Sequence, residues 1–147
     1  MKDYPSKNIR NIVILGHQGS GKTTLAESLL YVSKTIPKKG EVEKKTTVSD
    51  FLPEEQNRLS SLSTSVIPVE YNGLKLNFLD TPGNDEVVGQ LNQALSVVKG
   101  AILIIDATSR VQAGTERVGK EVRKRRIPTV IFINKMDKEN VKFDDLL

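Results

Sequence analysis

The 147-residue chain contains no cysteine and no tryptophan, and it has a single histidine. Without cysteine it can form neither a disulfide framework nor a Cys-based zinc site. Its seven aromatic residues, four Phe and three Tyr, are too few for the base-stacking platform of single-strand-binding proteins. No apolar run approaches the roughly 20 residues of a membrane-spanning helix, and the polar N-terminus lacks a signal-peptide core. We therefore expect a cytoplasmic protein with no membrane partner and no disulfide partner.

What the chain does contain fits one soluble globular domain. Its length is enough for a single hydrophobic core, and 37% apolar and 27% charged residues are ordinary values for such a domain. The formal net charge of +4 permits a nucleic-acid partner without requiring one. Composition alone indicates no oligomeric state.

The stretch GHQGSGKT at residues 16–23 matches the phosphate-binding pattern G-x-x-x-x-G-K-[ST] at every fixed position. A β-branched apolar run at 9–15 predicts a buried strand before it, and 24–34 carries apolar residues at helical spacing after it. Strand, glycine loop and helix in this order are the context that the motif requires. An ordinary glycine-rich turn is the alternative, and this context argues against it.

Each part of the loop has a task in holding phosphate. Inward-pointing loop amides form an anion nest, and the helix that follows adds its positive N-terminal end. Lys22 is expected to reach the β- and γ-phosphates, and the Thr23 hydroxyl to face Mg²⁺. The predicted nucleotide contacts of this segment are Gly16, His17, Gln18, Gly19, Ser20, Gly21, Lys22, Thr23 and Thr24.

The rest of the chain alternates strand and helix. Residues 66–71 and 74–80, joined by Asn72-Gly73, predict a hairpin, and Pro68 places its first strand at a sheet edge. Residues 35–65 lack periodicity and are predicted to be a long functional or disordered loop. Further predicted elements are helices at 87–99 and 112–126 and buried strands at 101–107 and 129–133. The predicted fold class is α/β: a mostly parallel sheet with one antiparallel edge strand and helices on both faces.

Two more polar segments follow predicted strands, at 80–83 (DTPG) and 134–137 (NKMD). In such sheets, ligands bind at the carboxyl ends of the strands, so these segments should lie beside the glycine loop. Asp80 can hold Mg²⁺ through water, and the Gly83 amide can meet a γ-phosphate. The neighbouring Thr81 and Pro82 are included among the predicted nucleotide contacts.

The NKMD segment is suited to reading a base. Asn134 and Asp137 can pair with guanine, because a carboxylate accepts from both N1–H and the exocyclic amine, whereas adenine has no donor at N1. The aliphatic stem of Lys135 can cover the ring, and Met136 completes the predicted contacts. An adenylate-using P-loop enzyme is disfavoured for the same reason.

In this order the motifs GHQGSGKT, DTPG and NKMD resemble the G domain of translational GTPases, in particular elongation factor G and its close paralogues. His17 inside the loop, the TLAESLLY helix and GTERV at 114–118 add to the resemblance, which covers residues 9 to about 140. It implies a P-loop NTPase G domain that binds GTP or GDP with Mg²⁺ and is an enzyme, a GTPase slow in isolation. It also implies that the ribosome is a partner and that it accelerates GTP hydrolysis.

The sequence departs from that family at four places. Asn84 stands where a water-orienting histidine is usual, and Gly19 replaces a loop aspartate. The switch I pattern R-G-I-T-I reads RLSSL at 58–62, in which Ser61 keeps the hydroxyl that a Mg²⁺ ligand needs. The chain also ends soon after NKMD, before the family's last guanine-binding loop. With these departures, the expected catalytic residues are Lys22, Gly83 and Asn84, and the expected metal ligands are Thr23, Ser61 and Asp80.

Residues 1–147 are expected to form one GTP-binding domain that is a fragment of a longer multidomain protein, a naturally short GTPase being the alternative. Two functions stay open. One is the GTP-hydrolysing domain of an elongation factor G-like translation factor. The other is a GTP- or GDP-dependent ribosome-binding regulatory module with weak or no hydrolysis, and Asn84 is the residue that separates them.

Three features have plain structural explanations beside functional ones. His17 can pack under the loop instead of acting in catalysis. Asp106, at the end of a predicted strand, is more typical of a turn than of a second metal ligand. The basic residues at 117–126 could contact ribosomal RNA, but Glu116 and Glu121 lie among them, which favours a solvated helix face.

Overall fold

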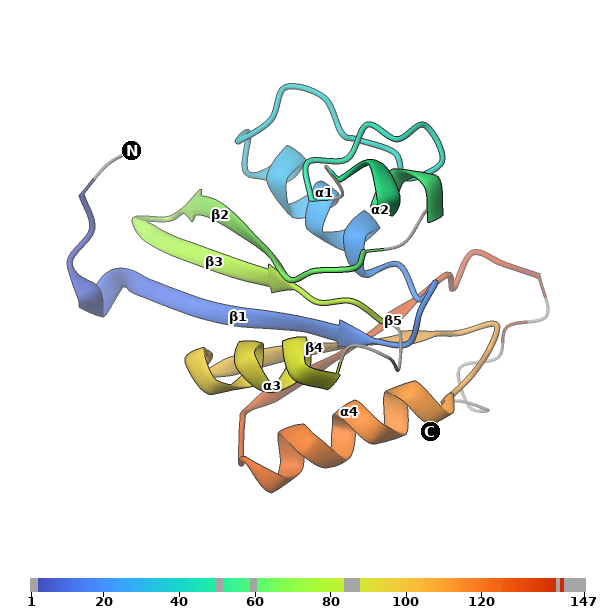
Figure 1. The fold of residues 1–147 in the computed structure, drawn as a ribbon. Helices are drawn as coiled ribbons and strands as arrows, with labels where there is room; N and C mark the ends of the chain where they lie inside the picture. The colour runs from blue at the N-terminus through green and yellow to red at the C-terminus, as the bar shows by residue number, and fades with distance from the viewer. Residues whose placement is uncertain (1–2, 50–51, 59–60, 84–87, 140, 142–147) are drawn as a thin grey trace.

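A five-stranded sheet with the strand order β2-β3-β1-β4-β5 forms the centre of the molecule in the computed structural model (Figure 1). The structure describes residues 3–49, 52–58, 61–83, 88–139 and 141. β1 is parallel to β3 and β4, β4 is parallel to β5, and β2 is antiparallel to β3. The predicted mostly parallel sheet with one antiparallel edge strand is therefore confirmed. Its strands are β1 (Ile9–Gly16), β2 (Ser65–Tyr71), β3 (Leu74–Asp80), β4 (Gly100–Asp106) and β5 (Thr129–Asn134).

Helices cover both faces of this sheet, as expected. A short 3-10 helix (Ser6–Asn8) precedes β1. On one face lie α1 (Lys22–Val32) and α2 (Pro53–Arg58), and on the other lie α3 (Val88–Val97) and α4 (Ala113–Lys124) (Figure 1).

Side chains of β1 alternate between two hydrophobic cores, as the two-residue period of a strand requires. Val13 and Leu15 lie in the core beneath α3 and α4, where Leu95 and Val118 meet them. Ile14 faces the other way and packs in the core that includes Ala26 and Leu30 of α1 together with Phe78 and Ile104. Residues 13–16, the second half of the central strand, are thus buried, and the carboxyl end of the strand is fixed where the glycine loop begins.

The hairpin formed by β2 and β3 follows its sequence signal. Asn72 and Gly73 both adopt positive φ angles, 47° and 75°, as a two-residue turn between right-twisted strands requires. Tyr71 and Leu74 are register partners on either side of the turn. Pro68 lies in β2, the edge strand, where a missing N–H can be tolerated.

β5 corrects one prediction. Its apolar sequence predicted a buried strand, but Val130 and Ile131 are 66% and 61% exposed. The reason is position: in the described part of the chain β5 pairs with β4 alone and forms the second edge of the sheet. An apolar run indicates a strand, but it does not tell which neighbours cover that strand.

The region between α1 and β2 corrects a second prediction. It was expected to lack regular structure, yet residues 53–58 form α2. Pro53 opens this helix, and Glu54 and Glu55 occupy its first turn, which are recognised helix-start signals. The described part of the chain contains no helix long and apolar enough to cross a membrane.

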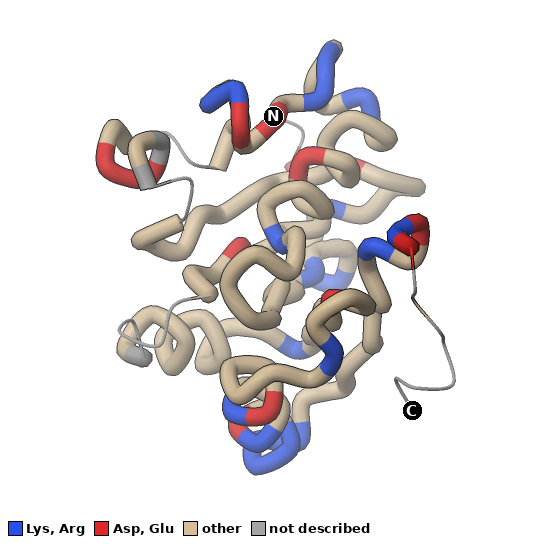
Figure 2. The backbone as a smooth tube through the Cα atoms, turned by 90° about the vertical axis from the view of Figure 1, so that its right-hand side faces the viewer, with Lys and Arg blue, Asp and Glu red and all other residues tan. Residues whose placement is uncertain are grey.

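Basic and acidic residues are interspersed along α4 (Figure 2), whose buried residues include Val118 and Val122 while Lys120, Arg123 and Lys124 are exposed. Lys120 pairs with Glu116, and Arg125 pairs with Glu121 and also donates to the side-chain oxygen of Asn92. Intrahelical pairs at this spacing are typical of a solvated face. This arrangement agrees with the structural explanation of the basic run.

Candidate nucleotide-binding site

The ends of β1, β3 and β5 bring the three predicted segments together at one edge of the sheet. The Thr23 hydroxyl, at the start of α1, donates to Asp80 Oδ2 at 2.9 Å. The Asn134 side-chain amide, at the end of β5, donates to the Ser20 carbonyl oxygen at 2.9 Å. Segments 16–23, 80–83 and 134–137, distant in sequence, therefore form one site, as the sheet topology predicted.

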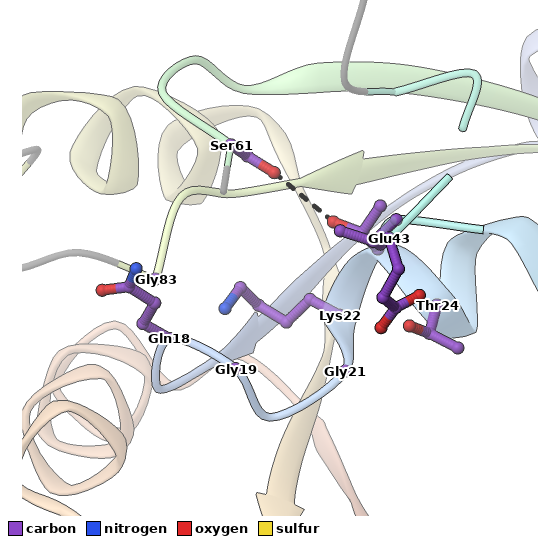
Figure 3. A pocket seen from close by; sticks show the side chains of 10 residues that line it. Gln18, Gly19, Gly21, Lys22, Thr24, Glu43, Ser61 and Gly83 are labelled. Carbon is purple, nitrogen blue, oxygen red and sulfur yellow. Dashed lines mark hydrogen bonds between the residues drawn. The ribbon is translucent and has the colours of Figure 1, made fainter. Parts of the chain in front are cut away.

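A cavity of about 210 Å³ lies at the N-terminal end of α1 (Figure 3). Gly21 precedes the helix with φ of 97°, a left-handed conformation that suits glycine. Because the first N–H groups of a helix lack partners within it, this end of α1 favours a bound anion. The cavity is lined by Gln18, Gly19, Gly21, Lys22, Thr23, Thr24, Val42, Glu43, Ser61 and Gly83.

Lys22 is the cationic group of this cavity. The residue is 7% exposed, and its ammonium donates to the carbonyl oxygens of Gly16 at 3.1 Å and of His17 at 2.9 Å. Figure 3 shows the side chain extending across the cavity toward Gln18 and Gly83. A positive charge in such a sheltered position attracts phosphate more strongly than one in water.

Gly83 comes close to the glycine loop. A Cβ at this position would collide with the Lys22 ammonium and lie 2.7 Å from the Gln18 backbone nitrogen. Only a residue without a side chain allows the DTPG backbone to approach this closely. Thr81, two residues earlier, is buried and donates from its hydroxyl to the Ile14 carbonyl oxygen at 2.8 Å. Its side chain therefore holds the segment against β1 and does not line the cavity.

Three side-chain oxygens converge at the edge of the cavity. Thr23 Oγ1 lies 2.9 Å from Asp80 Oδ2 and 3.4 Å from Ser61 Oγ. Asp80 is 1% exposed and Ser61 is 9% exposed, so the group is largely shielded from water. These are the three residues expected to be metal ligands, and the structure places them side by side.

The NKMD segment contacts the glycine loop through Lys135 as well as Asn134. Lys135 has a positive φ of 62°, and its ammonium donates to the Gly19 carbonyl oxygen at 2.9 Å and to Asp106 Oδ2 at 2.6 Å. Met136 and Asp137 are exposed at the surface beside it. The Met136 and Asp137 side chains, two of the predicted base contacts, thus lie on an open surface next to the cavity.

Asp106 forms a turn, as the structural explanation of this residue predicted. Its Oδ1 accepts the Thr108 N–H at 2.9 Å and the Thr108 hydroxyl at 2.6 Å. Burial acts to raise the pKa of the Asp106 carboxyl, but the hydrogen bonds from Lys135 and Thr108 outweigh burial and hold the pKa below its ordinary value. The charged form of Asp106, and so its pair with Lys135, is favoured.

Other predicted residues lie apart from the cavity. His17 lies against Gly114 at the start of α4, and among the described residues its buried Nδ1 has no hydrogen-bond partner. This placement agrees with packing under the loop. Gly16, Ser20 and Pro82 are also absent from the cavity lining. Asn84, expected to be catalytic, lies outside the described residues.

Sequence reasoning missed two residues that line the cavity, Val42 and Glu43. Both come from the connection between α1 and α2, and Figure 3 shows the Glu43 side chain close to Thr24. Their segment reads as mixed-charge loop, so neither periodicity nor a motif could have identified them.

Comparison with known proteins gives the family. The model of the elongation factor Tu GTP binding domain matches residues 7–147, nearly the whole chain. The chain belongs to this family. It is therefore a GTP-binding domain of the kind found in translation factors, with the α/β G-domain fold predicted from its motifs.

Relatives support the same assignment. The chain is 38% identical over 139 residues to mitochondrial ribosome-releasing factor 2 of Drosophila willistoni, covering 95% of the chain and 19% of that protein. It is 34% identical over 144 residues to elongation factor G 2 of Streptomyces coelicolor, covering 98% of the chain and 21% of that protein. The chain thus spans about a fifth of the length of these relatives.

Solved structures agree. A Thermus thermophilus protein of known crystal structure superposes with a TM-score of 0.89 at 34% identity, covering 94% of the chain and 21% of that structure. The translation elongation factor SelB of Methanococcus maripaludis, solved with the GTP analogue GppNHp, gives a TM-score of 0.70 at 17% identity, covering 99% of the chain and 25% of that structure. This second match supports the fold alone.

Proposed function

We propose that this chain binds GTP and GDP with Mg²⁺, hydrolyses GTP slowly, and acts as the G domain of an elongation factor G-like translation factor on the ribosome. The observation that carries the proposal is the convergence of Thr23, Asp80 and Ser61 at a cavity that Lys22 also lines. The names of the relatives, a ribosome-releasing factor and an elongation factor G, support the ribosome as partner.

The three converging oxygens fit an Mg²⁺ ion that is bound together with phosphates better than they fit a metal ion whose ligands all come from the protein. Mg²⁺ keeps several waters and is commonly bound by one or two carboxylates together with substrate phosphates. The site has one carboxylate, Asp80, and two hydroxyls. No cluster of three or more acidic, histidine or cysteine side chains suited to a metal occurs among the described residues. Thr23 and Ser61 would be direct ligands and Asp80 would act through water, the ion itself supplying charge neutralisation at the phosphates.

Hydrolysis of GTP requires positioning and charge stabilisation more than covalent chemistry by the protein. In the proposed mechanism, Lys22 and the loop amides hold the β- and γ-phosphates, and the Gly83 amide meets the γ-phosphate. Asn134 and Asp137 read the guanine edge while the Lys135 stem covers the ring. Thr24, which lines the cavity one residue beyond Thr23, contributes to the phosphate contacts.

Binding experiments on the 147-residue chain test the proposal. Isothermal calorimetry with Mg²⁺ should give saturable GDP binding, whereas ATP should bind at least about 100-fold more weakly, because an adenine leaves the Asp137 carboxylate without donors. Lys22→Ala should weaken GDP binding by roughly 100-fold, about the contribution of a charge-assisted contact, with the fold kept. Equal affinity for GDP and ATP would refute guanine recognition.

A matched control separates loss of contact from loss of fold. Lys120→Ala removes a lysine of α4 whose side chain is exposed and pairs with Glu116. This variant should bind GDP like the parent. If Lys22→Ala binds GDP within about threefold of the parent while circular dichroism shows both folded, the assignment of the phosphate site is wrong. The expected cytoplasmic location stays a prediction, since the relatives include mitochondrial proteins.

A further inference from the structure

Glu55 of α2 is a fully buried acidic side chain that serves as a hydrogen-bond acceptor for the backbone around it. Its Oε1 accepts the Leu62 N–H at 2.9 Å and both the N–H and the hydroxyl of Ser63 at 3.2 Å. Its Oε2 accepts the Leu52 N–H at 3.3 Å. One carboxylate thus joins the chain just before α2 to the chain after it. Such a buried carboxylate is stabilised only by the donors gathered around it.

The chain that Glu55 holds leads directly into the phosphate cavity. Ser61 immediately precedes Leu62, so a fixed Leu62 amide restricts where the Ser61 backbone can lie. The Ser61 hydroxyl lines the cavity and lies 3.4 Å from Thr23 Oγ1, which is the contact drawn as a dashed line in Figure 3. Glu55 itself does not line the cavity.

We propose that Glu55 is a positioning residue for recognition of a nucleoside triphosphate. It acts through the Leu62 and Ser63 amides to hold the Ser61 hydroxyl at the cavity, so that the chain distinguishes a triphosphate from a diphosphate. This inference rests on the proposed function, because it assigns a role to a residue behind the proposed Mg²⁺ and γ-phosphate site.

The physical reason for selectivity lies in which contacts each nucleotide makes. GDP and GTP share the groups proposed to meet the glycine loop and the NKMD segment, and only GTP carries a γ-phosphate. Without Glu55 the Ser61 segment is correctly placed for only part of the time, and apparent affinity falls in proportion to the fraction of competent molecules. That loss would apply to GTP, because the Ser61 hydroxyl would reach Mg²⁺ only where a γ-phosphate also holds the ion, whereas with GDP the ion would be held without Ser61.

The test compares affinities for GDP and for a non-hydrolysable GTP analogue, measured by calorimetry with Mg²⁺ on the 147-residue chain. The variants are Glu55→Ala, Glu55→Gln, Ser61→Ala and the double variant Glu55→Ala with Ser61→Ala. Glu121→Gln is the matched control, because this glutamate of α4 pairs with Arg125 and is no part of the cavity lining. Thermal unfolding of each variant shows whether it is folded.

Glu55→Ala should weaken the analogue by about tenfold, which is 1.4 kcal/mol, and change GDP affinity by less than about twofold. Glu55→Gln should lose less, about threefold, because its amide oxygen can still accept from Leu62 and Ser63 while its NH₂ faces the Leu52 N–H. Since Glu55 acts through Ser61, the double variant should be no weaker than the weaker single variant. Glu121→Gln should match the parent for both nucleotides.

Several results would overturn the inference. One is an equal loss of GDP and analogue affinity, which indicates a general structural role. A second is a loss in the double variant that equals the sum of the two single losses. A third is a folded Glu55→Gln chain with the same selectivity as the parent, and this result decides the matter if Glu55→Ala does not fold. A parent chain that binds neither nucleotide refutes the proposed function itself, and the inference with it. If the parent prefers the analogue over GDP and the Glu55 variants keep this preference, the inference is refuted and the proposed function stands.

Discussion

The ammonium of Lys135 lies 2.6 Å from the Asp106 carboxylate, and it also donates to the Gly19 carbonyl oxygen at 2.9 Å. One side chain therefore connects the end of β5 to both the end of β4 and the glycine loop. Asp106 and Asn134 are register partners in these two strands, so the sheet itself brings the pair together. Because these contacts already fix the NKMD segment against the glycine loop, we expect less ordering to remain for nucleotide binding.

Asp106→Asn should weaken GDP binding by about five- to tenfold, roughly the effect of one ordinary hydrogen bond. The amide keeps the size of the side chain but lacks the charge that holds Lys135. Calorimetry on folded variants measures the change. Glu41→Gln is the control, since it removes an exposed ion pair with Lys44 and should leave GDP affinity unchanged. Equal affinity of parent and Asp106→Asn would contradict a role for the pair.

The same pair predicts a pH dependence of stability. Because the folded pKa of Asp106 lies below the ordinary value of 3.8, the unfolded chain takes up the proton first as pH falls. The stabilisation is fully present above that ordinary pKa and is lost as pH falls through the folded pKa. The difference in unfolding free energy between parent and Asp106→Asn, measured in urea, should be constant from pH 7 to 5 and shrink in more acidic solution. A difference that grows on acidification would contradict this.

Asp137→Asn should move base preference from guanine toward xanthine. The Asn amide can donate to the carbonyl that xanthine carries in place of the exocyclic amine. With guanine, two donors would face each other, the Asn amide and the exocyclic amine. Paired titrations with GDP and xanthosine diphosphate should show a reversal of preference, with GDP weakened by at least about 100-fold. Since Asp137 is exposed, the fold should be unaffected. Unaltered GDP affinity would mean that another side chain reads the base.

Much of the fold was predictable because local and global signals agreed. The run at 9–15, the Asn72-Gly73 turn and Pro68 each specify a local geometry that the sheet also requires. The exposure of β5 was not predictable, because a strand's covering depends on neighbours that its own residues do not encode. Helix α2 was missed because its six residues are shorter than the window in which helical periodicity can be recognised.

The residues in and around the site also divide into those that the sequence could predict and those that it could not. The meeting of motif segments such as those of Lys22 and Asp80 at one edge of the sheet was predictable, since motifs at the carboxyl ends of neighbouring parallel strands must lie close together. Glu27 and Glu55 were not, because a buried carboxylate that binds backbone amides looks in sequence like any solvated glutamate. Both are fully buried, and Glu27 accepts the N–H groups of Gly40 at 3.0 Å and Val48 at 2.6 Å.

These contacts of Glu27 lead to a prediction about the segment between Gly40 and Val48, which carries the cavity residues Val42 and Glu43. Trypsin should cut the parent at the exposed Lys44 and Lys45, and a GTP analogue should slow this cleavage, because ligand binding favours the ordered form. Glu27→Gln removes one charged acceptor and should speed cleavage about threefold in the absence of nucleotide. Control cleavage after Lys124 should not respond to the analogue. Equal rates at Lys44 with and without ligand would contradict the expected coupling.

The last prediction concerns the hydrolysis rate and separates a GTPase from a regulatory module with weak or no hydrolysis. Lys22, the loop amides and Mg²⁺ would provide the charge stabilisation, but Asn84 stands where the family has a water-orienting histidine, and a carboxylate at Asp85 would face the negative γ-phosphate. The isolated chain should therefore hydrolyse GTP at roughly 10⁻⁴ s⁻¹ in single-turnover assays, the intrinsic rate of unassisted GTPases.

Asn84→His should change this rate by less than about threefold, because by family resemblance the histidine acts only when the ribosome orients it. With ribosomes added, a gain in Asn84→His alone would identify the parent as the regulatory form, and a comparable gain in both would identify it as a ribosome-activated GTPase. Hydrolysis by the parent alone at rates near 1 s⁻¹ would contradict the prediction, because another group would then have to position the attacking water.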